Sequence, residues 1–134
     1  MRGRKVLVDT SVWIDYLKEK NRAFQAKIDE IIDFYEVCVP KIVLAELIQG
    51  AKTDKEIAVI EEFSRAFTVI DQSEDTWIAA GKLSFTMKRK GVTVNLVDCY
   101  IAILANENKC AVLTLDEHFK SIAKFIKIDL MPQH

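Results

Sequence analysis

The chain has 134 residues, of which 50% are hydrophobic and 29% are charged, and its net charge is −1. This length fits one domain over residues 1–134, and the near-neutral charge means that any nucleic-acid binding requires local basic patches rather than a basic surface over the whole molecule. No apolar run could span a membrane, and the three cysteines form no C-x-x-C pair, so we expect a cytoplasmic protein with reduced thiols.

Apolar periodicity and turn residues divide the chain into strands that alternate with helices. In chain order, the pattern predicts a strand at 5–8, helices at 11–18 and 23–34, a strand at 37–39, helices at 42–49 and 54–65, and a strand at 67–70. It then predicts a long helix that begins near 73–75 and stops at Gly91, an extended connection at 92–97, a helix at 99–106, a strand at 111–114, a helix at 117–123 and a strand at 125–128.

This alternation indicates an α/β fold with a central parallel sheet of about five strands, covered by helices on both faces. Right-handed crossovers bring the C-terminal ends of all strands to one edge of the sheet. Ligands bind outside that edge, near the point where the strand order reverses. The candidate site residues are therefore those that follow strands.

Three aspartates stand where such an edge is expected. Asp9 follows the first strand, Asp116 follows the strand at 111–114, and Asp98 begins the helix that leads into that strand. Each also lies at the start of a helix, where an aspartate N-cap contributes about 1 kcal/mol. Taken singly, each is explained by capping. Taken together, Asp9 and Asp116 share one sheet edge if their strands are neighbours, and this favours a common chemical role.

Glu46 is unusual because it lies within the otherwise apolar run IVLAELI. Its helix neighbours at three and four positions are Ile42, Val43 and Gln49, and none carries a positive charge. Two interpretations stay open. Either the helix is tilted so that Glu46 reaches solvent, or a bound cation supplies the missing partner.

Converging carboxylates without basic neighbours repel one another. They stay ionised only around a metal ion, or else some of their pKa values rise. Ligand sets made only of oxygen suit Mg²⁺ or Mn²⁺. The matching chemistry is metal-assisted hydrolysis of phosphodiester bonds, in which the ion activates a water molecule and polarises the phosphate.

The chain resembles the PIN-domain ribonucleases, and in particular the small VapC-like toxins, over nearly its whole length. The matching segments follow the family order: VDTSVWIDYL with Asp9, AEL with Glu46, and KGVTVNLVDCYIAILANENKCAVLTLDEHF with Asp98 and Asp116. The resemblance implies a PIN-like three-layer α/β/α sandwich and a Mg²⁺- or Mn²⁺-dependent endoribonuclease. It also implies that water is the nucleophile and that the products carry a 5′-phosphate and a 3′-hydroxyl.

The resemblance also assigns roles to individual residues. It implies that the catalytic and metal-binding acids are Asp9, Glu46, Asp98 and Asp116, and that the hydroxyls which orient them are those of Thr10, Ser11 and Thr114. For Asn95, three residues before Asp98, two interpretations stay open: a hydrogen bond near the site or a role in the loop alone. His118 stands where many relatives have a further acid, and we expect a half-exposed helix histidine there. We expect Arg89 to contact RNA phosphate, although a cation at the end of the long helix also suits the helix dipole.

VapC-like toxins are held inactive by an antitoxin and commonly form dimers. The resemblance therefore implies an RNA substrate, a cognate antitoxin and a homodimer. Three alternatives stay open: an RNA-processing nuclease outside a toxin–antitoxin pair, an inert binding module, and a receiver-type phosphoryl-transfer domain. For the last, Asp71 follows a strand as a phosphoacceptor would, but VDTSV lacks the second acid that aspartyl phosphatases carry two residues on.

Overall fold

The structure is a computed structural model of the chain and describes residues 3–132. Its first elements are β1 (Lys5–Val8), α1 (Thr10–Lys18), α2 (Arg22–Phe34), β2 (Glu36–Pro40), α3 (Lys41–Gln49) and α4 (Asp54–Ala66). The remaining elements are β3 (Thr68–Ile70), α5 (Thr76–Arg89), α6 (Leu96–Glu107), β4 (Ala111–Leu113) and α7 (His118–Ile122). The predicted helices and the first four predicted strands are all present, with ends that shift by a few residues.

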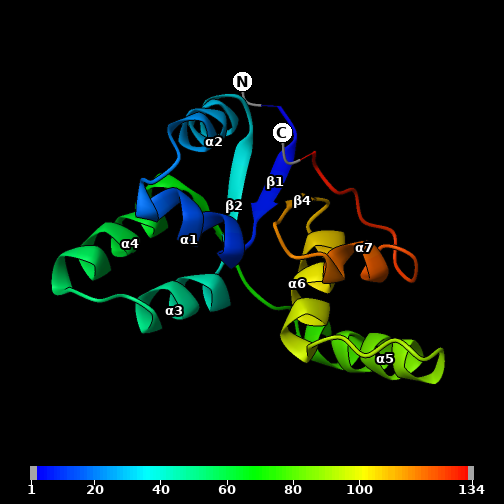
Figure 1. Cartoon of the computed structure of the whole chain (residues 1–134). Coiled ribbons are helices and arrows are strands. Elements are labelled where there is room, and N and C mark those ends of the chain that lie inside the picture. The colour runs from blue at the N-terminus through cyan, green and yellow to red at the C-terminus, as the bar shows by residue number, and fades with distance from the viewer. Residues whose placement is uncertain (1–2, 133–134) are drawn as a thin grey trace.

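The sheet is parallel and has the strand order β3-β2-β1-β4. Figure 1 shows β1 between β2 and β4. β1 lies between β2 and β4, and Leu7 pairs with Cys38 on one side and with Val112 on the other. The chain builds outwards from β1 through β2 to β3 and then returns to the opposite side of β1 with β4. This reversal places the switch point of the sheet between β1 and β4, where a ligand site is expected.

The strand predicted at 125–128 is not formed. Phe125 instead donates its backbone N–H to Ile122 O at 2.9 Å and continues the turn that ends α7. A single parallel bridge between Val112 and Leu130 takes the fifth place in the sheet, so the described chain has four strands rather than about five. Periodicity alone does not separate a short apolar strand from an apolar helical turn, and this explains the error.

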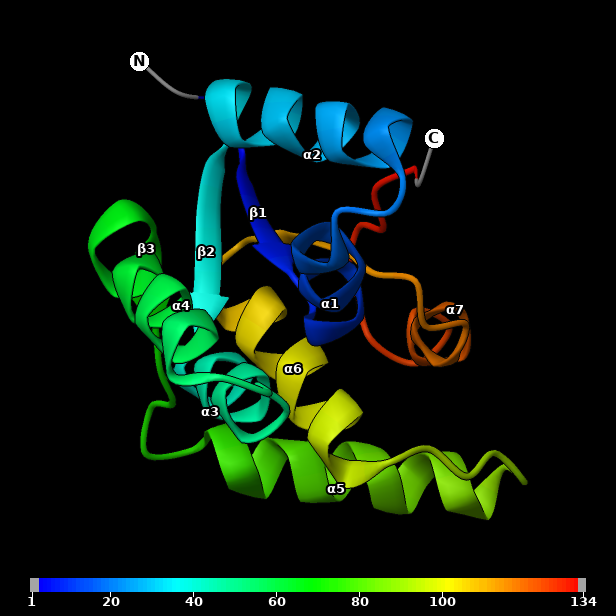
Figure 2. The same cartoon turned by 60° about the vertical axis from the view of Figure 1, so that its left-hand side comes forward.

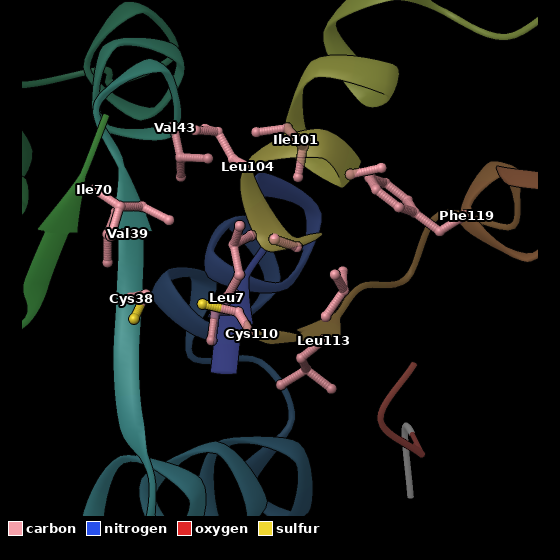
Figure 3. Close-up of a cluster of buried hydrophobic side chains, with 14 of the residues drawn as sticks. Leu7, Cys38, Val39, Val43, Ile70, Ile101, Leu104, Cys110, Leu113 and Phe119 are labelled. Carbon is pink, nitrogen blue, oxygen red and sulfur yellow. The ribbon is translucent and has the colours of Figure 1, made fainter. Parts of the chain in front are cut away.

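The strands are buried on both faces. Val6, Leu7 and Val8 are each 0% exposed, as a parallel sheet covered by helices requires. The run 99–105 of α6 is buried as well, which makes α6 the central helix of the packing. Figure 3 shows Leu104 of this helix in one cluster with side chains from the strands. The predicted α/β fold with a helix-covered parallel sheet is confirmed.

Gly91 ends α5 as predicted. Its φ of +83° lies in the left-handed region, which glycine adopts without strain. The chain then leads to Asn95, whose side chain accepts a hydrogen bond from the backbone N–H of Val97 at 2.6 Å and caps α6. This connection brings Asp98 into the first turn of α6.

The three cysteines are buried free thiols, as expected from their apolar contexts. Figure 3 shows Cys38 and Cys110 among the aliphatic side chains of the core. Among the helices of the described chain, none combines the length and the apolar composition that crossing a membrane requires.

Candidate functional site

Asp9 lies at the C-terminal end of β1, beside the end of β4. Its backbone N–H donates to Leu113 O at 3.0 Å and so extends the pairing of the two strands. The residue is 7% exposed, and its Oδ2 accepts hydrogen bonds from the hydroxyls of Thr114 (2.9 Å) and Ser11 (3.0 Å). Although Asp9 stands at the N-cap position of α1, none of the described N–H groups of that helix bonds to its side chain. Its carboxylate is therefore held for something other than capping.

The hydroxyls that hold Asp9 also join the segments that follow β1 and β4. Ser11 Oγ accepts a hydrogen bond from the backbone N–H of Leu115 at 3.0 Å. Thr114 Oγ1 accepts one from the backbone N–H of Asp116 at 2.9 Å. Asp9 and Asp116 are thus tied to the same hydroxyl, and they share one sheet edge as predicted.

Asp98 lies in the first turn of α6, with Asn95 as the N-cap of the helix. The capping interpretation therefore does not hold for Asp98, because the side chain that caps is that of Asn95. The Asp98 side chain is 18% exposed. Burial, followed by the negative charges of Asp116 and Asp9, raises the pKa of Asp98 to about 6. The charges of Asp9 and Asp116 thus both act on Asp98.

Asp116 organises the turn after β4. Its Oδ1 accepts a hydrogen bond from the backbone N–H of His118 at 2.9 Å. The turn brings His118 Nδ1 to 3.2 Å from Asp116 Oδ1 and to 3.5 Å from Asp98 Oδ2. Asp98, Asp116 and His118 each offer a ligand atom, and these atoms all lie within 4.8 Å of one another.

His118 is the member of this cluster that the sequence did not reveal. The expected half-exposed helix histidine is present, since the side chain is 57% exposed, but its ring faces two aspartates. The contact between His118 and Asp116 depends on the geometry of a turn, and the sequence pattern does not predict that geometry. The available signal was the spacing: aspartate side chains commonly accept the N–H of the residue two positions on.

Glu46 lies on α3 and is exposed, as the first of the two interpretations of its apolar surroundings requires. Its Oε1 accepts a hydrogen bond from the Thr10 hydroxyl at 2.8 Å. Because Thr10 directly follows Asp9, this bond links α3 to the end of β1. Glu46 is therefore linked to the site by its hydrogen bond to Thr10 and does not belong to the compact group of Asp98, Asp116 and His118.

An open groove lies beside Glu46, between α1, α3 and α4. Its volume is about 700 Å³, and its walls are mainly apolar. The apolar lining includes Ile14, Leu17, Leu47 and Val59. Glu46, which is hydrogen-bonded to Thr10, thus forms part of the groove wall.

Two other residues singled out in the sequence lie in different surroundings. The guanidinium of Arg89 lies 5.7 Å from the centre of the Phe85 ring, and its contact with RNA stays a prediction. Asp71 follows β3, an edge strand, and forms an ion pair with Lys41 at 3.4 Å. A phosphoacceptor at Asp71 would therefore stand on the far side of β2 from Asp9, away from the other acids.

His118 lies beside two of these acids, but the site has no permanently charged basic partner within the described residues. Among residues 3–132, no lysine or arginine forms an ion pair with Asp9, Asp98 or Asp116. Carboxylates in such a cluster repel one another, and this repulsion adds to the effect of burial in raising the pKa of Asp98. A cation that bridges the carboxylates would remove this repulsion.

Comparison with known proteins places the chain in a family. The PIN domain family model matches residues 6–125. Ribonuclease VapC1 of Methanocaldococcus jannaschii is 28% identical over 122 residues, which cover 90% of this chain and 83% of that protein. The tRNA(fMet)-specific endonuclease VapC of Salmonella typhimurium is 28% identical over 114 residues, with coverages of 82% and 85%.

Solved structures agree with this result. A chain in the crystal structure of DNA-bound VapBC from Salmonella typhimurium matches with a TM-score of 0.80 and 26% identity, over 98% of this chain and 100% of that one. The segment that the family model matches contains Asp9, Glu46, Asp98 and Asp116. The chain therefore belongs to the PIN domain family, as its resemblance implied.

Proposed function

We propose that the protein is a metal-dependent endoribonuclease that hydrolyses RNA phosphodiester bonds. The observation that carries this proposal is the meeting of Asp9, Asp98 and Asp116 at the switch point, with the pKa of Asp98 raised to about 6. Clustered carboxylates bind a divalent cation well, and without a bound cation their mutual repulsion destabilises the fold. The ribonuclease and endonuclease names of two relatives support the same activity.

The donor atoms of the site suit Mg²⁺ or Mn²⁺. Carboxylate oxygens from Asp9, Asp98 and Asp116, together with Glu46, are ligands that both ions accept. His118 adds an imidazole nitrogen within the compact group. Nitrogen donors suit Mn²⁺ better than Mg²⁺, so this chain is expected to prefer Mn²⁺ more strongly than a site built from oxygen alone.

The side chains of this protein would hold and orient the acids. When bound, the cation supplies Lewis-acid chemistry: it lowers the pKa of a bound water and polarises the scissile phosphate. Thr114 and Ser11 fix Oδ2 of Asp9, so the other carboxylate oxygen can face the ion. Thr10 holds Glu46 in the same manner. We assign water as the nucleophile, so that no side chain forms a covalent bond to RNA.

We also propose that this nuclease is the toxin of a toxin–antitoxin pair, that it acts in the cytoplasm, and that residues 1–134 form a single PIN-like domain. The VapBC complex from Salmonella typhimurium supports the pairing with an antitoxin. The apolar groove beside Glu46 supports it as well, because a peptide segment seated there would lie against Glu46. Buried free thiols are consistent with a reducing compartment.

Cleavage of a labelled RNA panel tests the nuclease proposal. Activity is expected with Mn²⁺ or Mg²⁺ and none with EDTA, and Asp9→Asn and Asp98→Asn should abolish cleavage while the circular dichroism spectrum is retained. Asp71→Asn is the matched control, because that aspartate pairs with Lys41 at β3 and should not affect cleavage. Cleavage in EDTA, or full activity of both site variants, would refute the mechanism. A folded protein that cuts no RNA would favour an inert binding module.

The toxin role needs a separate experiment. If the neighbouring gene encodes a short antitoxin-like protein, that product should form a complex with this chain and inhibit its cleavage of RNA. A Val59→Glu variant, which places a charge in the groove, should weaken the complex and leave cleavage by the free enzyme intact. Cleavage that this product does not inhibit would favour an RNA-processing nuclease outside a toxin–antitoxin pair.

A further inference from the structure

Two of the three buried thiols lie together in the core. Cys38 is in the middle of β2, Cys110 immediately precedes β4, and the two residues are 0% and 5% exposed. Figure 3 shows the side chain of Cys110 directed towards β2, where Cys38 lies, with Leu7 of β1 beside them. A hydrogen bond between the two thiols lowers the pKa of Cys38, and the same hydrogen bond, followed by burial, raises the pKa of Cys110. Cys38 is therefore the member of the pair that ionises first.

The other contacts of the two thiols are weak. Cys38 Sγ donates to the backbone oxygen of Glu36 at 3.9 Å, and Cys110 Sγ donates to that of Asn108 at 3.8 Å. Thiols are weak donors, so an ion that replaced the two thiol hydrogens would displace little. The third thiol differs, because Cys99 lies on α6 and its pKa is raised by burial and by the charge of Asp98.

The strand order keeps the two cysteines too far apart for a disulfide. β1 lies between β2 and β4, so the Cα atoms of Cys38 and Cys110 are separated by two strand spacings, about 9.6 Å or more. Disulfide-bonded Cα atoms are about 4.4–6.8 Å apart, so β1 would have to move away before the bond could form. Leu7 holds β1 in place, since it is 0% exposed and pairs with strands on both sides.

The same spacing suits an ion between the two sulfurs. Thiolates that lie about 2.3 Å from a shared metal stand up to about 4.6 Å apart, which is close to the separation of hydrogen-bonded thiols. In the part of the chain that the structure describes, the potential ligands that gather in threes are Asp98, Asp116 and His118, so neither thiol has a third ligand of these types. A tetrahedral zinc site needs four ligands. Two thiolates alone suit Cu(I), a soft ion that accepts linear coordination.

Lys5 supplies a positive charge beside the pair. Two thiolates and one Cu(I) carry a net charge of −1, which is costly in an apolar core unless it is compensated. The charge of Lys5 acts on both thiols and favours their ionised forms, although the charge of Glu36 opposes it. Lys5 stands in register with Glu36 at the start of β1 and is exposed, so its ammonium group also remains hydrated.

We propose that Cys38 and Cys110 form a binding site for one Cu(I) ion, which the two sulfurs hold in a linear arrangement across β1. Each thiol releases its proton to solvent as the ion binds, so one Cu(I) replaces two protons and nothing is oxidised or reduced. The site is separate from the acids, because Cys110 precedes β4 whereas Asp116 follows it. Figure 2 shows α2 across the ends where β1 and β2 begin, opposite the ends that lead to the acids. The proposal therefore does not depend on nuclease activity.

Titration of the full chain with Cu(I), kept reduced by ascorbate under nitrogen, tests the proposal in competition with the chelator bicinchoninate. The wild type should bind one Cu(I) per chain, and X-ray absorption should show two sulfur neighbours and no nitrogen or oxygen neighbour. Loss of an outer partner alone costs about 10- to 100-fold in metal affinity, so Cys38→Ala and Cys110→Ala should each cost about 100-fold or more.

Cys99→Ala is the matched control, because it removes an equally buried thiol outside the pair. This variant should bind Cu(I) as the wild type does. A wild type that does not compete with the chelator, an equal loss of affinity in all three variants, or oxygen neighbours around the copper overturns the proposal.

Two measurements on the wild type keep the test independent of variants that fail to fold. The thiol oxidant diamide should leave the metal-free folded chain with three free thiols, because β1 separates the pair. The chain unfolded in urea should lose most of its affinity for Cu(I), because bringing the two distant cysteines together then costs loop entropy. A disulfide between Cys38 and Cys110 in the folded chain, or an unfolded chain that binds Cu(I) as tightly as the folded one, overturns the proposal.

Discussion

Replacing Asp98 by asparagine should stabilise the metal-free protein at alkaline pH and not at acid pH. Burial and the charges of Asp116 and Asp9 raise the pKa of Asp98 from its ordinary 3.8 to about 6. The native state thus binds this proton more tightly than the unfolded state, and stability falls as the pH rises from about 4 through about 6. The difference between the two pKa values corresponds to roughly 3 kcal/mol, which the asparagine variant should regain at about pH 8.

Urea unfolding in EDTA at a series of pH values measures this effect. The informative quantity is the change, between about pH 4 and pH 8, in the stability difference between variant and wild type, because contributions that do not depend on pH cancel in this change. Asp71→Asn is the control, since that exposed aspartate in a surface ion pair should change stability by less than about 1 kcal/mol. A difference for Asp98→Asn that does not grow with pH would show that the fold does not raise the pKa of Asp98.

Four other substitutions test separate parts of the structure. Thr114→Val removes the hydroxyl that holds Asp9 at 2.9 Å, and calorimetry with Mn²⁺ should show an affinity about 10- to 100-fold lower in a protein that still folds. His118→Ala should lower the affinity for Mn²⁺ more than that for Mg²⁺, and equal losses for the two ions would rule out a nitrogen ligand. Gly91→Ala should lower stability in urea by about 1 kcal/mol, because the φ of Gly91 is +83°, whereas Gly81→Ala in the helix interior should raise it by a similar amount.

The sequence predicts the sheet and the approximate place of the acids because both depend on short-range patterns. Apolar strands alternate with amphipathic helices, and the position after a strand is defined by the strand itself. The meeting of Asp9 with Asp116 needed one further condition, that β1 and β4 pair, and the observed register fulfils it. Parallel pairing joins residues far apart in the chain, so a local pattern predicts the strands but not their order.

The details of the site depend on side-chain geometry that no local pattern contains. Asn95, three residues before Asp98, is the N-cap of α6. Which of the two residues caps the helix depends on where the chain turns into α6. His118 faces two aspartates because Asp116 accepts its backbone N–H and orients the turn. Glu46 reaches solvent and meets Thr10 because α3 packs next to α1, a contact between elements that α2 and β2 separate in the chain.

The electrostatics of the site link metal binding to folding. Ionised Asp98 destabilises the metal-free native state by roughly 3 kcal/mol at neutral pH and above. A cation that binds only the native state, present at 100 times its dissociation constant, stabilises that state by about 2.7 kcal/mol. The two quantities are of similar size, so an ion bound at this concentration should offset most of the cost of keeping the buried Asp98 ionised beside the other acids. The stability gained on adding Mn²⁺ should consequently be larger for the wild type than for Asp98→Asn, which has less repulsion to relieve and one ligand fewer. Equal gains would mean that the ion binds elsewhere.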